Sequence, residues 1–232
     1  TTNAIRLDRV IDDLVAAGLE RLNISLDTVD PEKFTSLTRR DKLDDVIAGV
    51  RAAQQSGLRP IKLNAVAMRD VNDDEFVDLL RFAIDHDAEL RFIEQMPLDA
   101  GHIWSRARMV PGEEILEKLS AAFTLTPVGD RGSSPAEEFL VDGGPATVGV
   151  IASVSAPFCG ACDRVRLTAD GQLRNCLFAR SESDLQGLLR SGGTDEQIAT
   201  MVRASIAGKL AGHGIDDPGF LQPDRPMSAI GG

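Results

Sequence analysis

Hydrophobic and polar positions follow two different periods along the first hundred residues. Apolar residues alternate with polar ones over residues 21–27, 60–68 and 90–97, which predicts three strands. Apolar residues recur every three or four positions over residues 43–57 and 73–86, which predicts two amphipathic helices. Strands that alternate with helices through short connections are typical of parallel sheets with right-handed crossovers. The pattern therefore predicts an α/β fold.

The polar residues inside these strands favour one of two α/β architectures. A doubly wound sheet is covered by helices on both faces, so its strands are apolar throughout. Polar or charged side chains nevertheless occur within the predicted strands, at Asn23, Ser25, Lys62, Asn64 and Arg91. A barrel whose interior is open to a ligand explains them better than a doubly wound sheet does. We therefore predict part of a (β/α) barrel over residues 1–100.

The pattern changes after residue 100. It predicts, in order, a loop over residues 99–114, a helix to about residue 122, two strands within residues 137–155, two short helices within residues 181–209 and an extended tail. Strands and helices no longer alternate regularly in this part. We therefore expect a second, smaller α+β domain over residues 101–232.

Composition narrows the classes of protein to which the chain could belong. The 232 residues suffice for one large domain or two modest ones, and 43% of them are apolar, so a substantial core can form. The net charge of −11 argues against a general nucleic-acid or anionic-membrane surface. No apolar run reaches the roughly 18 residues of a membrane span, and no signal-peptide pattern opens the sequence. We therefore expect a protein of the reducing cytoplasm, without nucleic-acid or membrane partners.

The first residues suggest that the sequence begins inside a domain. Thr1, Thr2 and Asn3 resemble the end of a strand that leads into a helix, and no initiator Met precedes them. We expect the chain to be the C-terminal part of a longer protein, with the first barrel strands upstream. An interrupted barrel leaves a sheet edge unpaired, which favours aggregation or contacts within a homodimer.

All three cysteines of the chain lie in one short segment. Cys159 and Cys162 form a CxxC step, and Cys176 follows after thirteen further residues. Clustered thiols in a reducing compartment indicate metal or redox chemistry rather than disulfides. Zinc would need a fourth ligand from elsewhere, because the segment contains no histidine. A [4Fe–4S] cluster can be held by three cysteines, with one iron open to a substrate nitrogen or oxygen. Buried cysteines without a ligand are the alternative.

Two arginines follow the CxxC step. If the chain is extended there, Cys162, Arg164 and Arg166 lie on one face. Guanidinium groups match phosphate oxygens with paired hydrogen bonds, so this face suits an anionic ligand beside the metal. A solvated strand face, with charges paired to Asp163 and Asp170, is the alternative. These residues alone do not decide between the two interpretations.

The cysteine–arginine block resembles the C-terminal cluster segment of the GTP 3′,8-cyclases, the radical-SAM enzymes that open molybdenum cofactor biosynthesis. Further blocks of that family occur in the same order: TTN (1–3), NISLDT (23–28), KLN (62–64), RFIEQMP (91–97), SVSAPFC (153–159) and IGG (230–232). The resemblance therefore extends over the whole chain. It implies an incomplete (β/α) radical-SAM-type barrel, followed by a smaller α+β domain that carries an auxiliary iron–sulfur cluster.

The resemblance also implies roles for individual residues. Cys159, Cys162 and Cys176 would hold the auxiliary [4Fe–4S] cluster, whose open iron meets the guanine of GTP. Ser25 and Met96 would contact S-adenosylmethionine. The GTP-binding residues would be Thr1, Lys62, Arg91, Arg164 and Arg166. The tail residues Gly231 and Gly232 would reach into the active site.

The activity implied by the resemblance is the conversion of GTP to (8S)-3′,8-cyclo-7,8-dihydroguanosine 5′-triphosphate, on which a cyclic pyranopterin synthase then acts. The family's CxxxCxxC motif, which holds the cluster that cleaves S-adenosylmethionine, does not occur in these residues. We therefore expect a second [4Fe–4S] cluster upstream and no activity from this chain alone. An auxiliary-cluster domain of another radical-SAM maturase and a non-catalytic zinc or nucleotide-binding module are the two alternatives.

Overall fold

The computed structural model describes residues 1–230, which form two compact units. The first, called here the sheet unit, combines residues 1–95 with residues 108–155. The second, called here the cysteine unit, combines residues 96–107 with the chain from residue 156 onward.

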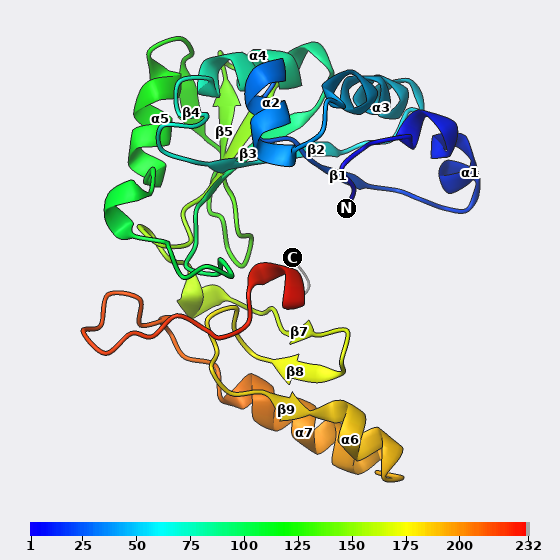
Figure 1. Ribbon diagram of the computed structural model, residues 1–232, viewed down its shortest axis with the longest axis vertical. Coiled ribbons are helices and arrows are strands. Elements are labelled where there is room, and N and C mark those ends of the chain that lie inside the picture. Colours follow the sequence, from blue (N-terminus) through cyan, green and yellow to red (C-terminus); the bar gives the residue numbers. More distant parts are fainter. Residues whose placement is uncertain (231–232) are drawn as a thin grey trace. The chain divides into compact units, whose positions relative to one another are not determined.

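The sheet unit is built around a six-stranded sheet of order β1-β2-β3-β6-β5-β4 (Figure 1). The first four strands in this order are parallel, and β5 and β4 are antiparallel to their neighbours. The bounds are β1 (Leu22–Ser25), β2 (Ile61–Ala67), β3 (Glu89–Glu94), β4 (Leu125–Pro127), β5 (Glu137–Val141) and β6 (Thr147–Ile151). The predicted α/β class with parallel strands is confirmed.

Helices cover one face of this sheet. Figure 1 shows α2 (Pro31–Thr38), α3 (Leu43–Gln55) and α4 (Phe76–Asp85) on the same side of the strands. The chain also forms η1 (Leu7–Arg9), α1 (Ile11–Ala16) and α5 (Gly112–Ser120), and α5 packs against β3, β6 and α4. The helices predicted at 43–57 and 73–86 are α3 and α4, whereas α1 and α2 were not predicted. Within residues 1–230, every helix is too short or too polar to span a bilayer.

The two faces of the parallel strands differ in burial. Along β2 the residues alternate strictly, so that Ile61 and Leu63 are buried while Lys62 and Asn64 are half-buried. The strand β3 alternates in the same way, with Arg91 among its half-buried residues. Ile61, Leu63, Leu90 and Phe92 therefore contribute to a core on one face, whereas Lys62, Asn64 and Arg91 lie on the other, as the sequence predicts for Lys62 and Asn64.

The sheet unit takes in residues from beyond position 100. Residues 108–155 belong to the sheet unit, because β6 pairs with the free edge of β3. The buried carboxylate of Glu94, at the end of β3, holds this later segment in place. It accepts hydrogen bonds from the N–H of Gly112 at 2.6 Å and from the N–H of Val154 at 2.7 Å. The two strands expected within 137–155 are thus part of the main sheet rather than of a separate domain.

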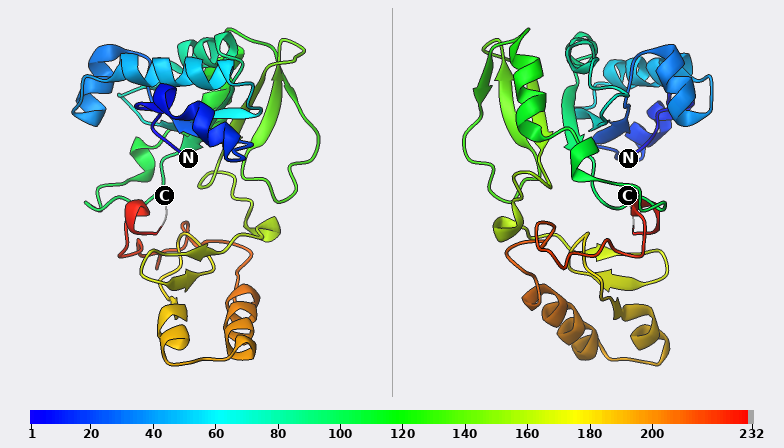
Figure 2. Two further views of the ribbon diagram at one scale, coloured as in Figure 1. Left: turned by 90° about the vertical axis from the view of Figure 1, so that its right-hand side faces the viewer. Right: turned by 60° about the vertical axis from the view of Figure 1, so that its left-hand side comes forward.

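The cysteine unit contains a small antiparallel sheet and two helices. The sheet has the order β7-β8-β9, and Figure 2 shows α6 and α7, in gold and orange, side by side. The bounds are η2 (Arg106–Arg108), η3 (Cys159–Ala161), β7 (Arg166–Leu167), β8 (Gln172–Arg174), β9 (Ser183–Asp184), α6 (Leu185–Arg190), α7 (Asp195–Ala207) and η4 (Met227–Ala229). A capping box of Thr194 and Gln197 begins α7. The two predicted short helices are confirmed.

Candidate functional site

Two cations and one acid lie together on the polar face of the sheet unit. The Glu89 carboxylate is 3.0 Å from Lys62 Nζ and 2.7 Å from Arg91 Nε. The three side chains are only 13–19% exposed. Asn64 pairs with Arg91 across the strands, and its buried Oδ1 atom has no hydrogen-bond partner among residues 1–230. This face therefore carries one surplus positive charge and one unsatisfied acceptor, a combination suited to a ligand that has both anionic groups and N–H donors.

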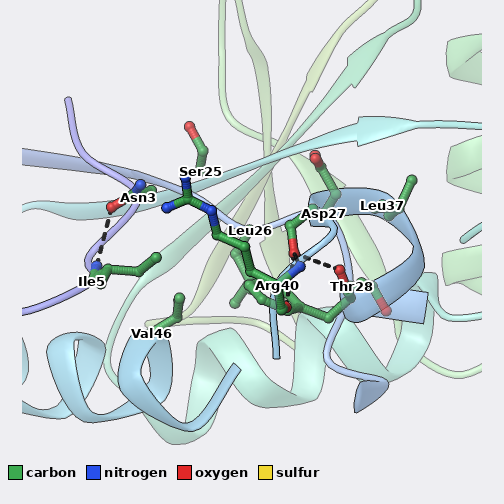
Figure 3. A pocket seen from close by; sticks show the side chains of 11 residues that line it. Asn3, Ile5, Ser25, Leu26, Asp27, Thr28, Leu37, Arg40 and Val46 are labelled. Carbon is green, nitrogen blue, oxygen red and sulfur yellow. Dashed lines mark hydrogen bonds between the residues drawn. The ribbon is translucent and has the colours of Figure 1, made fainter. Parts of the chain in front are cut away.

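The start of the chain lies beside the end of β1. Thr2 N–H donates to the Asn23 carbonyl at 2.9 Å, and Ser25 N–H donates to the Thr2 carbonyl at 3.0 Å. This bridge places the exposed residues Thr1 and Asn3 next to the C-terminal end of β1, where Ser25 is exposed. Ser25 and Asn3 line one pocket of about 420 Å³ (Figure 3). Ligands of parallel α/β structures commonly bind at this end of the strands.

Asp27, two residues after Ser25, is a half-buried acid. Asp27 also lines the pocket, and its Oδ1 atom accepts a hydrogen bond from Val66 N–H at 2.8 Å. Burial raises the pKa of Asp27, because desolvation of the carboxylate outweighs the hydrogen bond from Val66. Sequence reasoning did not identify Asp27 as a site residue.

The cysteine segment places three unpaired thiols near one another. Cys159 and Cys162 stand at the ends of the η3 turn, where Cys162 N–H donates to the Cys159 carbonyl at 3.2 Å, and Cys176 follows β8. All three are half-buried and none forms a disulfide. Within the described part of the chain, no three His, Cys, Asp or Glu side chains converge as the ligands of a single metal ion do.

Neighbouring charges shift the pKa values of two of the thiols, Cys159 and Cys162. Burial raises the pKa of Cys159, and the charges of Cys176 and Cys162 raise it further. Burial also acts to raise the pKa of Cys162, but the backbone N–H and the guanidinium of Arg164 outweigh it and lower this pKa. Arg164 therefore favours the thiolate, which is the form that binds metals.

The two arginines after the CxxC step are held differently. Arg164 is exposed, and its Nη2 atom lies 3.5 Å from Cys162 Sγ while its guanidinium stacks on the Phe158 ring at 4.9 Å. Arg166 is half-buried and its Nη1 atom donates to the Ile230 carbonyl at 3.4 Å. Burial lowers the pKa of Arg166, and the charges of Arg164 and Arg174 lower it further. Positive charge is therefore concentrated beside the thiols.

Two further cations shape this segment, and sequence reasoning missed both. Lys209 Nζ donates to the carbonyl of Arg164 at 2.7 Å and to that of Asn175 at 2.6 Å. Arg174 is almost fully buried, forms an ion pair with Glu182 and donates to the carbonyl of Ala179. No motif marks them, because their partners are backbone carbonyls and a local acid. They hold the loops that carry Arg164 and the third cysteine.

Met96 lies in the cysteine unit on a small apolar cluster. The cluster consists of Leu98, Phe178 and Ile230, and both Met96 and Cys176 pack against it. The turn η4 joins it, because Met227 N–H donates to the Leu98 carbonyl at 2.9 Å. Met96, an expected S-adenosylmethionine contact, and Cys176, an expected cluster ligand, therefore pack against the same apolar cluster. The tail residues Gly231 and Gly232 lie outside the described residues.

Two family models match successive parts of the chain. Residues 1–83 match the family described as "Radical SAM superfamily", and residues 88–215 match "Molybdenum Cofactor Synthesis C". The GTP 3′,8-cyclase of Streptomyces coelicolor is 59% identical over 234 residues, which cover all of this chain and 69% of that relative. The GTP 3′,8-cyclases of Mycobacterium sp. (strain KMS) and Mycolicibacterium smegmatis are 59% and 54% identical, and the chain covers 67% and 66% of them.

The chain belongs to the GTP 3′,8-cyclase family. The resemblance noted from its sequence blocks is thereby confirmed, and it favours this family over another radical-SAM maturase or a zinc module. The chain spans about two thirds of the length of these relatives.

For a GTP 3′,8-cyclase, the expected site residues divide between the two units. Thr1, Ser25, Lys62 and Arg91 belong to the sheet unit. The cysteine unit holds Met96, Cys159, Cys162, Arg164, Arg166 and Cys176. Within the sheet unit Lys62 and Arg91 share the Glu89 carboxylate, and within the cysteine unit Arg164 contacts Cys162.

Proposed function

We propose that this chain supplies the GTP site and the auxiliary-cluster site of a GTP 3′,8-cyclase in molybdenum cofactor biosynthesis. The reaction converts GTP to (8S)-3′,8-cyclo-7,8-dihydroguanosine 5′-triphosphate. The observation that carries the proposal is the contact of Arg164 with Cys162, which joins a phosphate-binding group to a metal-binding one.

The three cysteines are suited to a [4Fe–4S] cluster. Such a cluster takes each cysteine on a different iron, so the three sulfurs need not converge on a single ion. Cys159, Cys162 and Cys176 are unpaired and half-buried, and Arg164 favours the thiolate at Cys162. When bound, the cluster supplies one Lewis-acidic iron without a cysteine, open to an oxygen or nitrogen of the guanine.

The chain's own cations would bind the rest of GTP. Arg164 and Arg166 would hold phosphate oxygens beside the thiols. Lys62 and Arg91 supply the surplus charge on the sheet face, and the unsatisfied Asn64 Oδ1 could accept an N–H of the nucleotide. Thr1 would be a further GTP contact.

The sheet unit would be the C-terminal part of a radical-SAM barrel. Parallel strands, helices on one face and polar side chains on the other support this assignment. Ser25 and Met96 would contact S-adenosylmethionine. The cysteine unit would be the auxiliary-cluster domain, and Gly231 and Gly232 would complete the active site.

The proposal extends to partners. A cyclic pyranopterin synthase would act on the product. The strand β1 stands at one end of the sheet order, and Thr2 pairs with it only by an isolated bridge. Such an edge can pair with another strand, so two copies could associate there as a homodimer.

Anaerobic reconstitution with iron and sulfide tests the cluster. We expect about four irons and four sulfides per chain, with a brown colour. Cys176→Ala should lose the iron while circular dichroism shows a folded chain. Retained iron in this variant would contradict the ligand set. One zinc per chain without colour, after parallel incubation with zinc, would favour a zinc module.

A further inference from the structure

A lysine just after α7 connects the two halves of the cysteine segment. Lys209 Nζ donates to the carbonyl of Arg164 at 2.7 Å and to the carbonyl of Asn175 at 2.6 Å. Arg164 is the second residue after Cys162, and Asn175 directly precedes Cys176. One ammonium group therefore fixes the backbone beside two of the three expected cluster ligands. All of these residues belong to the cysteine unit.

The end of α7 determines where this lysine lies. Lys209 is half-buried, and its N–H donates to the Ile206 carbonyl at 3.1 Å, which continues the helical hydrogen bonds for one more turn. A second contact fastens the same helix end to the cysteine segment, because Asn175 Nδ2 donates to the Ser205 carbonyl at 3.3 Å. The Lys209 ammonium group is therefore held at a defined place by both its backbone and its side-chain contacts.

Among residues 1–230, no carboxylate forms an ion pair with Lys209. The two carbonyls that it contacts are uncharged, so its positive charge is not neutralised. This charge is close enough to act on two of the thiols. Burial is the main influence on the pKa of Cys159 and of Cys162, and in both cases the charge of Lys209 acts against it, toward the thiolate.

The other cations of the segment differ from Lys209 in this respect. Arg174 is neutralised by its ion pair with Glu182. Arg164 and Arg166 would hold phosphate oxygens in the proposed function, so a bound nucleotide would neutralise them. Two of the three N–H groups of Lys209 are already engaged by carbonyls. Lys209 is therefore the cation whose charge would persist beside the thiols when the nucleotide is bound.

We infer that Lys209 raises the reduction potential of the auxiliary [4Fe–4S] cluster, because its uncompensated charge is fixed beside the segment that would hold the cluster. Reduction adds one electron to the cluster, and a nearby positive charge favours the more negative state. Lys209 would act as a positioning residue that also supplies charge, and not as a ligand. This inference rests on the proposed function, which provides the cluster.

A redox titration of the reconstituted whole chain tests the inference. Dithionite supplies the electron, and electron paramagnetic resonance follows the reduced cluster. Lys209→Gln removes the charge and keeps an N–H donor, so the one-electron equilibrium constant for reduction should fall roughly 3- to 10-fold, a shift of about 30–60 mV to more negative potential. Lys209→Arg keeps the charge and should keep the potential. Arg203→Gln is the matched control, because it removes a positive charge from α7 at a side chain that is 70% exposed and screened by solvent.

The possible results separate the inference from the function on which it rests. An unchanged potential in iron-loaded Lys209→Gln would overturn the inference and leave the cluster site standing. An equal shift in Arg203→Gln or in Lys209→Arg would also overturn it, because the effect would then not belong to the charge at this position.

Iron content, measured before each titration, covers the remaining results. If Lys209→Gln bound no iron, iron uptake by Lys209→Arg at the unsubstituted potential would support the inference, and no uptake would overturn it. If the unsubstituted chain bound no iron, the proposed cluster site itself would be wrong, and this inference with it. Circular dichroism of each variant checks that folding is intact.

Discussion

The carboxylate of Asp27 accepts the N–H of Val66 at 2.8 Å and so joins the C-terminal ends of β1 and β2. Burial makes this contact costly, because desolvation raises the pKa of Asp27 above its ordinary value of 3.8. Above the raised pKa the folded chain carries a partly desolvated charge at Asp27, whereas the unfolded chain carries a fully solvated one. Ionised Asp27 therefore lowers the free energy of unfolding at neutral pH.

Asp27→Asn should consequently increase the free energy of unfolding at pH 7. Its gain over the unsubstituted chain should shrink as the pH falls through the raised pKa toward 3.8, because Asp27 then becomes neutral in both states. Urea unfolding at pH 7 and pH 4 measures the difference. Asp41→Asn, at an exposed loop position, is the control and should differ little at either pH. A gain that grows on acidification would contradict the assignment.

Glu89→Gln should lower the stability of the chain and raise its affinity for GTP. Lys62 and Arg91 would lose their shared carboxylate, so the free energy of unfolding should fall by about 1–3 kcal/mol for this partly buried network. If these cations bind GTP, its affinity should rise roughly 3- to 10-fold, because no carboxylate competes with phosphate. Calorimetric titration measures the affinity, and Glu137→Gln on the exposed side of β5 is the control. Weaker GTP binding in a folded Glu89→Gln variant would show that Glu89 itself contacts the nucleotide.

Arg164→Ala and Arg166→Ala should each weaken GTP binding by about 1.5–3 kcal/mol, the usual range for a charge-assisted contact. Equilibrium binding to the reconstituted chain measures the loss. Arg203→Ala is a suitable control, because this arginine on α7 is 70% exposed. Unchanged affinity in both variants would remove these arginines from the GTP site.

Gly49→Ala should destabilise the sheet unit although alanine favours helices. A Cβ atom at Gly49 would lie 2.3 Å from the carbonyl oxygen of Ala4, so α3 would have to move away from the first residues. We expect the free energy of unfolding to fall by about 1–3 kcal/mol. Gly219→Ala, which would meet no atom within 4 Å, should be nearly neutral in the same denaturation experiment. Equal stability of the two variants would mean that the approach of α3 to Ala4 is looser than described.

The local pattern of the sequence predicted several of the elements but not all of them, and it did not predict how the strands pair. Period-two alternation located β2, whose buried and half-buried residues alternate strictly. The helix α2 was missed, although Asp30 caps it and Pro31 begins it, because only Phe34 of its residues is buried. The pairing of β6 with β3 joins segments far apart in sequence, and periodicity carries no information about such contacts.

Some residues of the candidate site could likewise be identified from the sequence, whereas others could not. The spacing of Cys159, Cys162 and Cys176 could be recognised from sequence, because thiols are rare and their chemistry is specific. Lys209 could not be, since lysine is common on surfaces. Its contacts are with the loop carbonyls of Arg164 and Asn175, which only the fold brings near it.

The late return of β6 to β3 affects how the protein is made. On the ribosome, β3 emerges and pairs with β2, but its other edge must wait until Thr147–Ile151 has been translated. At about 5–20 residues per second this delay is roughly 3–10 seconds. Throughout that interval the backbone N–H and C=O groups along this edge of β3 are unpaired and can bind another strand. A shortened gene that ends near residue 100 would make that state permanent, so any expression fragment of the sheet unit should extend to residue 155.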